Sequence, residues 1–282
     1  MAQLNRRQML KGSVAGSFAL GAAGLFGTAH AAGAVKFPKK WDETVDVIVI
    51  GSGFAGMAAA IEAKNAGANV IVLEKMPTYG GNSAINGGIL TATGCPQQKK
   101  HGIKDSPELL AHDMLVAGLY MNQPEKVKLV ASHALSNYEW TVNYLGVEYN
   151  PDAIGQEGGH SVPRYVFTKN GSGSGITSKE KQKLDELGVK IRTRTYVKHI
   201  FRNDDGRVVG IEVREGYRFP NENSGRTKFI AAKKGVVLCY GGFSCDVPYR
   251  TMQNPMLTAK FDSTNQPGAT AELWRETSRI GC

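Results

Sequence analysis

The feature that most constrains the fold is a glycine-rich turn between a strand and a helix. Residues 45–50, mostly Val and Ile, predict a buried strand, and residues 51–56 follow with the sequence G-S-G-F-A-G. Residues 57–65, rich in Ala, predict a helix that ends at Gly67, and residues 69–73 predict a second apolar strand. Apolar strands joined by a helix are typical of a parallel sheet covered on both faces. We therefore expect an α/β domain.

The same turn predicts a dinucleotide site. Gly51 permits the tight turn, Gly53 lets the backbone approach a pyrophosphate, and Gly56 lets the helix pack close to the sheet. The helix N-terminus then presents its N–H groups and positive dipole end to the phosphates. Glu74 follows the second strand, where a carboxylate accepts hydrogen bonds from a ribose. This arrangement does not by itself distinguish NAD from FAD.

The loop of residues 79–88 distinguishes the two cofactors. It combines four glycines with small polar side chains, including Asn82 and Ser83. Such a loop offers N–H, hydroxyl and amide groups to a second set of phosphate and ribityl oxygens. A flexible surface loop would have the same composition, but the position just beyond Glu74 favours a cofactor contact.

The first 31 residues predict export by the twin-arginine route to the periplasm. Residues 5–11 read N-R-R-Q-M-L-K, residues 12–28 form an apolar run of small residues, and residues 29–31 fit a signal peptidase site. The alternative is a disordered basic tail. Twin-arginine export carries folded proteins, which suits a chain that acquires its cofactor before leaving the cytoplasm. Residues 32–44 are expected to be a linker.

Charge and cysteine usage exclude several function classes. The formal net charge of +9 could attract small anions or an acidic partner, although a basic excess is more often only a solvated surface. No zinc spacing, helix-turn-helix signal or basic stripe with interleaved aromatics is present, so we expect no nucleic-acid partner. The cysteines form no C-x-x-C or haem-attachment motif and the histidines are scattered, so no metal site is predicted. Cys239 and Cys245 could pair, but the apolar surroundings of Cys239 favour a buried thiol.

The rest of the sequence predicts helices and strands that form the scaffold of the domain. Helices are expected at residues 107–119, 124–145 and 177–187, a β-meander at 190–202, 207–214 and 226–231, and a further strand at 236–240. A final amphipathic helix is expected near the C-terminus, with Leu273, Trp274, Thr277 and Ile280 on one face that lacks packing partners.

With these motifs in order, the chain resembles the flavocytochrome c fumarate reductases and their relatives, including urocanate reductases. The likeness runs through residues 80–83, 105–109, 158–161 with Arg164, 171–175, 208–211, 241–243 and 264–270. It implies a Rossmann-like FAD-binding domain over residues 45–282, with a parallel sheet plus a β-meander.

The resemblance also assigns roles to single residues. Ala55 would touch the pyrophosphate, the backbone of Val197 would meet the adenine ring, and Glu74 would bind the adenosine ribose. Gly87 and Gly88 would line the flavin side with Asn82 and Ser83, and Gly241 and Gly242 would mark the close approach of a second strand. The full expected cofactor-binding set is Gly51, Gly53, Ala55, Gly56, Glu74, Lys75, Gly81, Asn82, Ser83, Gly87, Gly88, Val197, Gly241 and Gly242.

Two departures from the family pattern affect the expectations. Asn82 stands where succinate dehydrogenase-type relatives carry a histidine bonded to the flavin, so the FAD is expected to be noncovalent. The loop of residues 82–87 is one residue shorter than expected and closer to that of the 3-ketosteroid dehydrogenases. The Gly-Asp-Gly of the family is replaced by residues 271–273, which read A-E-L.

The catalytic groups are not expected in this chain. The resemblance implies that a capping domain, following residues 265–270, supplies the substrate clamp and the arginine that donates a proton. The chain ends at Cys282, so the FAD-binding domain is expected to be C-terminally truncated, without catalytic residues. We expect Arg164 and Ser161 to make structural or cofactor contacts and His160 to be exposed.

The resulting function hypothesis is a periplasmic reductase of the fumarate reductase type. It would reduce the C=C bond of a small α,β-unsaturated carboxylate, with electrons from a separate cytochrome c or a membrane quinol-linked donor. One alternative is a 3-ketosteroid-dehydrogenase-like flavoenzyme. The other is a truncated, non-catalytic FAD-binding fragment.

Overall fold

The computed structural model describes residues 35–282. The twin-arginine signal expected at residues 1–31 and the start of the expected linker lie outside the described residues. The linker expected over residues 32–44 is too long at its C-terminal end, since the first strand begins at Glu43. Among the described residues, no helix is both long and apolar enough to cross a membrane.

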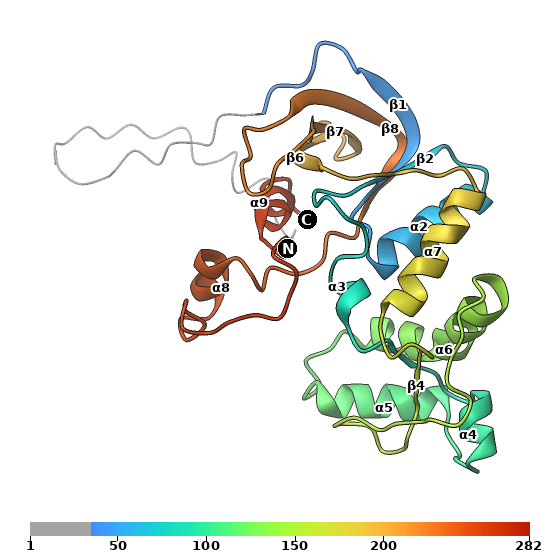
Figure 1. Ribbon diagram of the computed structural model, residues 1–282. Coiled ribbons are helices and arrows are strands. Elements are labelled where there is room, and N and C mark those ends of the chain that lie inside the picture. The colour runs from blue at the N-terminus through green and yellow to red at the C-terminus, as the bar shows by residue number, and fades with distance from the viewer. Residues whose placement is uncertain (1–34) are drawn as a thin grey trace, which may run out of the picture. The chain divides into compact units, whose positions relative to one another are not determined.

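A six-stranded sheet organises the unit from Phe37 to Cys282 (Figure 1). Its strand order is β5-β2-β1-β8-β7-β6, with β1 Glu43–Ile50, β2 Val70–Leu73, β5 Ile191–Arg192, β6 Thr195–Arg202, β7 Val208–Glu215 and β8 Arg226–Leu238. Strands β5, β2, β1 and β8 run parallel, whereas β8, β7 and β6 form an antiparallel meander. This confirms the expected α/β class with a parallel sheet plus a β-meander.

The two faces of β1 belong to two different hydrophobic cores. Val49 packs with helices α2 (Phe54–Asn65) and α7 (Ser174–Glu186), while Ile48 and Ile50 pack with the residues of the meander. Successive strand side chains point to opposite faces, so a mostly apolar strand such as β1 must be covered on both sides. The expected helix at residues 177–187 is confirmed as the greater part of α7.

A helical lobe lies between β2 and β5 in the sequence (Figure 1). It contains α4 Pro96–Lys100, α5 Pro107–Ala117, α6 Pro124–Glu139 with its π-helical extension Trp140–Tyr144, and a small sheet of β3 Ile89–Thr91 and β4 Tyr165–Phe167. Ser106 caps the N-terminus of α5, because its Oγ accepts a hydrogen bond from the Leu109 N–H at 3.2 Å. The helix expected at residues 107–119 ends early, since Leu119 and Tyr120 adopt left-handed backbone conformations.

Other element boundaries differ from the expectations. The strands expected at residues 226–231 and 236–240 are one continuous strand, β8. The strand expected at residues 190–202 is broken at Arg194, whose φ of 51° turns the chain from β5 into β6. The loop of residues 79–88 contains a short helix, α3 Gly81–Ile85. The β3–β4 sheet and helices α4 and α8 (Val247–Gln253) were not expected.

The C-terminal helix α9, Glu272–Arg279, packs on the edge strand β6. Glu276 accepts a hydrogen bond from the Ile200 N–H at 2.6 Å, and Arg279 donates one to the Ile200 carbonyl at 3.0 Å. Thr277 and Ile280 are buried by this packing. The expectation that this helix face lacks packing partners is therefore wrong, because Leu273 and Ile280 pack with the core of the meander and Trp274 packs edge-on against Tyr240 and Phe243.

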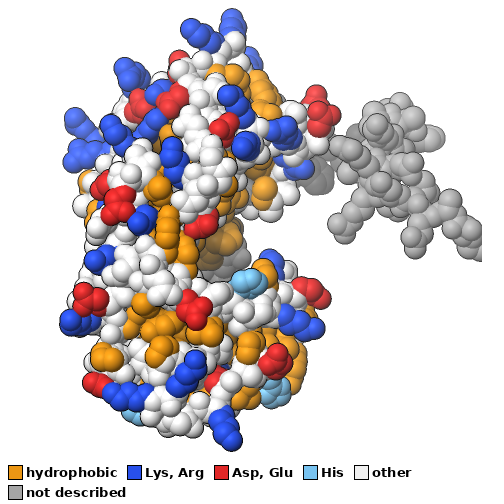
Figure 2. Space-filling model, turned by 90° about the vertical axis from the view of Figure 1, so that its right-hand side faces the viewer, with side chains coloured by type: hydrophobic (Ala, Val, Ile, Leu, Met, Phe, Trp, Pro, Cys, Tyr) orange, Lys and Arg blue, Asp and Glu red, His pale blue; other side chains and the backbone are white. Residues whose placement is uncertain are grey.

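The surface carries charges of both signs. Figure 2 shows Lys and Arg side chains interspersed with Asp and Glu on one face of the molecule. All four cysteines are free thiols, and Cys239 is half-buried rather than fully buried, with a thiol pKa raised by burial.

Candidate functional site

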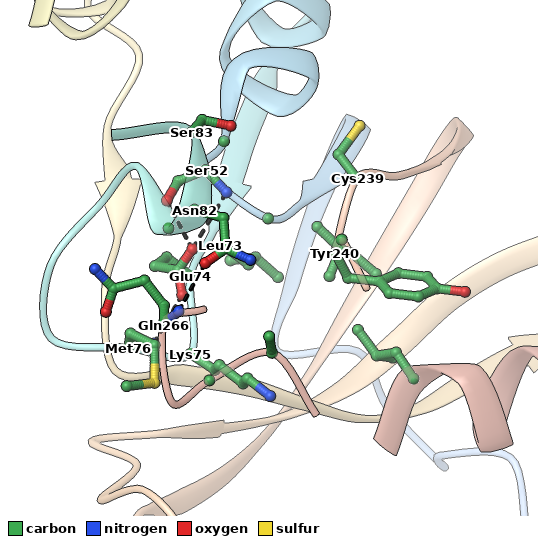
Figure 3. Close-up of a pocket in the computed structure, with 18 of the residues that line it drawn as sticks. Ser52, Leu73, Glu74, Lys75, Met76, Asn82, Ser83, Cys239, Tyr240 and Gln266 are labelled. Carbon is green, nitrogen blue, oxygen red and sulfur yellow. Dashed lines mark hydrogen bonds between the residues drawn. The ribbon is translucent and has the colours of Figure 1, made fainter. Parts of the chain in front are cut away.

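A cavity of about 300 Å³ lies at the C-terminal ends of β1, β2 and β8. Ligand sites of open α/β sheets occur at this edge, where the loops after the strands diverge. Segments far apart in the chain line the cavity: residues 50–55, 73–76, 80–83, 195–197, 239–242 and 266–273. Figure 3 shows side chains from several of these segments around the cavity.

The glycine-rich turn brings the ends of β1 and β8 into contact. Gly51 has φ +102°, and a Cβ built on it would lie 2.2 Å from the carbonyl oxygen of Cys239. A Cβ on Gly56 would lie 2.0 Å from the carbonyl oxygen of Gly51. These approaches leave no room for a side chain, so the turn and the helix packing expected from the two glycines are both present.

The N-terminus of α2 faces the cavity with unused donors. The Phe54 N–H donates to Ser83 Oγ at 3.1 Å. The N–H groups of Ala55 and Gly56 donate to no acceptor within the described part of the chain. Free N–H groups at the positive end of a helix dipole suit a phosphate group. Gly53, the N-cap, adds no side chain of its own to the cavity.

Glu74 is held at the end of β2 by defined hydrogen bonds. Its Oε2 accepts from the Ser52 hydroxyl at 2.6 Å and the Ser52 N–H at 3.2 Å, and its Oε1 accepts from the Met76 N–H at 2.8 Å. Glu74 is 9% exposed and lines the cavity beside Ser52 (Figure 3). Oε1 accepts one hydrogen bond and keeps a lone pair free, so Glu74 can accept a further hydrogen bond from a ribose hydroxyl.

Lys75 and Asn82 line the cavity, but their polar groups bind other protein groups. Lys75 Nζ forms an ion pair with Glu272 Oε2 at 3.0 Å. The Asn82 side chain donates to Asn265 Oδ1 at 2.6 Å and accepts from the Gln266 N–H at 2.7 Å. Both residues therefore hold the C-terminal segment against the cavity.

Of the fourteen residues expected to bind the cofactor, eleven line the cavity and three do not. The cavity is lined by Gly51, Gly53, Ala55, Glu74, Lys75, Gly81, Asn82, Ser83, Val197, Gly241 and Gly242. Gly56, Gly87 and Gly88 do not line it. A Cβ on Gly88 would meet Thr168 Oγ1 at 2.0 Å, so Gly88 packs against the loop before α7.

Several residues that line the cavity were not predicted from the sequence. Ser52 lies between Gly51 and Gly53. Its place in this turn could have suggested that its hydroxyl donates a hydrogen bond to Glu74. Tyr196 neighbours the expected Val197. Thr270, Glu272 and Leu273 reach the cavity only through the tertiary fold, because nearly 200 residues separate them from β2.

Arg164 lies outside the cavity lining, in a buried charge cluster of the helical lobe. Its guanidinium donates to Asp105 Oδ1 at 2.9 Å and Oδ2 at 3.0 Å, and to Asp113 Oδ2 at 2.5 Å. Ser161 donates its hydroxyl to Asp113 at 2.8 Å. Burial opposes ionisation of Asp113, but hydrogen bonds from Ser161 and Arg164 hold its pKa below the usual value. Arg164 and Ser161 therefore make structural contacts, which is one of the two roles expected for them.

His160 is half-buried, so its expected exposure is wrong. Its Nδ1 is buried and has no hydrogen-bond partner within the described chain. Burial lowers the pKa of His160, and the nearby charge of Arg164 lowers it further.

Comparison with known proteins identifies the family. A family model described as FAD binding domain matches residues 46–278. The acrylate reductase flavoprotein subunit of Shewanella woodyi is 41% identical over 99% of this chain and 54% of its own length. The urocanate reductase of Eggerthella lenta is 34% identical over 86% of this chain and 39% of its own length. The chain thus spans about half, or less, of the curated relatives it matches.

A solved structure extends the likeness to three dimensions. The open conformation of a flavocytochrome c3 fumarate reductase superposes with a TM-score of 0.77 at 31% identity, covering 86% of this chain and 41% of the other. A 3-ketosteroid-Δ4-(5α)-dehydrogenase from Rhodococcus jostii superposes with a TM-score of 0.75 at 26% identity, covering 86% of this chain and 55% of the other. The chain belongs to the FAD-binding domain family, whose cofactor is FAD.

Proposed function

We propose that this chain is the cofactor-holding part of an FAD-dependent reductase that acts on the C=C bond of a small α,β-unsaturated carboxylate. The observation that carries the proposal is the cavity edged by Glu74 and by the free Ala55 N–H at the start of α2. That cavity belongs to a chain that aligns over 99% of its length with an acrylate reductase flavoprotein subunit. Bound FAD supplies the hydride for such a reduction.

The chain's own residues would bind and orient the cofactor. The Ala55 N–H at the cavity wall suits the pyrophosphate, and the Glu74 carboxylate suits the adenosine ribose. Gly241 and Gly242 expose backbone at the cavity without side chains. Asn82 carries an amide rather than an imidazole at the position compared with the flavin-linked histidine, so the FAD is held noncovalently.

The substrate, the electron donor and the export route complete the proposal. No Arg or His lines the cavity within the described residues. By the family resemblance, the group that binds the substrate carboxylate and protonates its α-carbon would come from a capping domain. Electrons would come from a separate cytochrome c or a quinol-linked membrane protein, and the chain would reach the periplasm by twin-arginine export.

Flavin absorbance provides the first test. The chain is purified with excess FAD and desalted, and absorbance bands at about 370 and about 450 nm report retained flavin. Acid precipitation should release the flavin into the supernatant, as expected for a noncovalent cofactor. A chain that remains colourless would refute the cofactor role, and flavin that precipitates with the protein would refute noncovalent attachment.

Activity is tested separately with reduced methyl viologen as electron donor. Acrylate, fumarate and urocanate are each offered to the flavin-loaded chain, alone and with the remaining segment of a full-length relative. Reductase activity that appears only with that segment supports the proposed division of roles. Oxidation of a 3-ketosteroid with a dye acceptor, with no activity on the three acids, would favour the alternative suggested by the Rhodococcus structure. No activity under any condition would favour a non-catalytic FAD-binding fragment.

A further inference from the structure

The C-terminal segment of residues 265–273, here called the strap, forms one wall of the cofactor cavity. Its lining residues are Gln266, Gly268, Ala269, Thr270, Glu272 and Leu273. In the close-up, Gln266 lies beside Glu74, Lys75 and Met76 (Figure 3). The Cys245 N–H donates to the Ala269 carbonyl at 2.9 Å and the Ala271 N–H donates to Asp246 Oδ2 at 3.0 Å, so the middle of the strap is held by residues 245–246.

Two attachments tie the strap to the stretch that runs from the end of β2 into α3. The first is the Asn82 amide, which bonds Asn265 and the Gln266 N–H. The second is Lys75, whose Nζ donates to Thr270 Oγ1 at 2.5 Å and to Glu272 Oε2 at 3.0 Å. The attachments therefore lie at the two ends of the strap.

The Lys75–Glu272 pair is stronger than an ordinary surface ion pair. Their side chains are 20% and 15% exposed, so solvent and salt screen their attraction less than that of a fully exposed pair. The Thr270 hydroxyl also donates to Glu272 Oε2 at 2.5 Å. Removal of either charged partner would leave the other at the cavity wall without its counter-ion, which favours the open position of the strap.

We propose that the Lys75–Glu272 ion pair is a latch that keeps the strap closed on bound FAD and sets the rate at which FAD leaves. This rests on the proposed function, because FAD is taken as the occupant. The strap is one wall of the cavity, so its opening widens the route by which a bound dinucleotide departs. Loss of the latch should therefore act mainly on the dissociation rate. Lys75 and Glu272 are positioning residues in this proposal.

The main test measures FAD release from four variants. These are Lys75→Met, Glu272→Gln, the double variant, and the reversed pair Lys75→Glu with Glu272→Lys. Flavin fluorescence after dilution should show release about tenfold faster in each single variant, or roughly the effect of one part-buried ion pair. The double variant should be no faster than the singles, because the two residues act as one pair. The reversed pair should restore slow release to within about threefold.

A matched control separates the latch from a general loss of charge. Lys169 pairs with Glu148 on the surface, where the two side chains are 73% and 66% exposed. Lys169→Met should leave the release rate unchanged. Urea midpoints of all variants should lie close to that of the native chain, since the latch spans only the strap. Equal release rates in the native chain and the single variants, or a reversed pair as fast as the singles, would overturn the proposal.

Hydrogen exchange tests the latch without FAD. In the cofactor-free chain, amides of residues 265–273 should exchange about tenfold faster in Lys75→Met and Glu272→Gln than in the native chain or Lys169→Met. Unchanged exchange in both latch variants would overturn the latch. A native chain that retains no flavin would instead refute the proposed function, and the exchange result would still decide whether the ion pair holds the strap.

Discussion

Replacement of Arg164 by Met should destabilise the fold strongly without touching the cofactor cavity. The Arg164 guanidinium is completely buried and neutralises two carboxylates, Asp105 at 0% and Asp113 at 6% side-chain exposure. Met keeps much of the side-chain volume but removes the charge and every guanidinium hydrogen bond. The carboxylates are then left close together in the interior with only neutral donors such as Ser161 and Gln98.

The size of the effect follows from that geometry. Removal of one partner from a buried ion pair costs about 3–5 kcal/mol, because the remaining charge is desolvated without compensation. A domain of ordinary stability unfolds with about 5–15 kcal/mol, so the variant should lose a large part of its margin. With a urea m-value of about 3 kcal/mol/M, a loss of about 4 kcal/mol lowers the unfolding midpoint by roughly 1.3 M.

Urea unfolding at pH 7, followed by Trp fluorescence, measures this loss. Arg226→Met is the control, because the Arg226–Glu215 pair lies at the surface with the arginine 83% exposed, and its loss should cost less than about 1 kcal/mol. Combining Arg164→Met with Asp105→Asn and Asp113→Asn should recover part of the stability, since no charge is then left unpaired. A midpoint within about 0.3 M of the native value for Arg164→Met alone would refute the reasoning.

Three further results are expected. Burial raises the pKa of Glu180 to about 9, so its carboxyl is neutral in the folded chain but ionised in the unfolded chain between the ordinary value of 4.5 and that pH. The free energy of unfolding should therefore fall as pH rises through this window. Urea midpoints measured at pH 5 and pH 8 should differ less for Glu180→Gln than for the native chain, and equal differences in the two proteins would contradict this explanation. Glu74→Ala should weaken FAD binding about tenfold or more in a fluorescence titration, and unchanged affinity would exclude Glu74 as a ribose ligand. Gly51→Ala should cost at least about 2 kcal/mol in urea unfolding, because its Cβ meets the Cys239 carbonyl and its φ is +102°; a neutral variant would show that the turn can shift.

The β-α-β unit could be predicted because all of its signals are local. The apolar strands, the glycine turn and Glu74 lie within about thirty residues, and each local preference agrees with the others. The meander was also recognisable from its alternating strands. The break at Arg194 was not, because a non-glycine residue with positive φ has no reliable sequence signal.

The rest of the cavity depends on contacts between distant segments. Glu272 meets Lys75 across 197 residues, and Asn82 meets Gln266 across 184. Sequence spacing carries no information about such pairs. Residues 79–88 were expected to form a loop without regular structure, yet Gly81–Ile85 form a helix, at whose start the Gly80 carbonyl accepts from the Ala84 N–H at 3.2 Å. The likeness to known flavoproteins indicated the neighbourhood of the cofactor, but not which side chains already bind each other.

The pairing of β8 with β1 determines when the sheet can be completed during synthesis. Strand β8 pairs in parallel with β1 from Glu43↔Ile230 to Ile50↔Leu238, so the centre of the sheet joins residues separated by nearly 190 positions. While the ribosome is still adding those residues, β1 and β2 can pair, but the other edge of β1 has no neighbour. An apolar strand with one unpaired edge is a template for aggregation. A nascent chain that stalls before residue 226 should therefore need a chaperone on that edge, whereas a chain released after residue 238 can complete its own sheet.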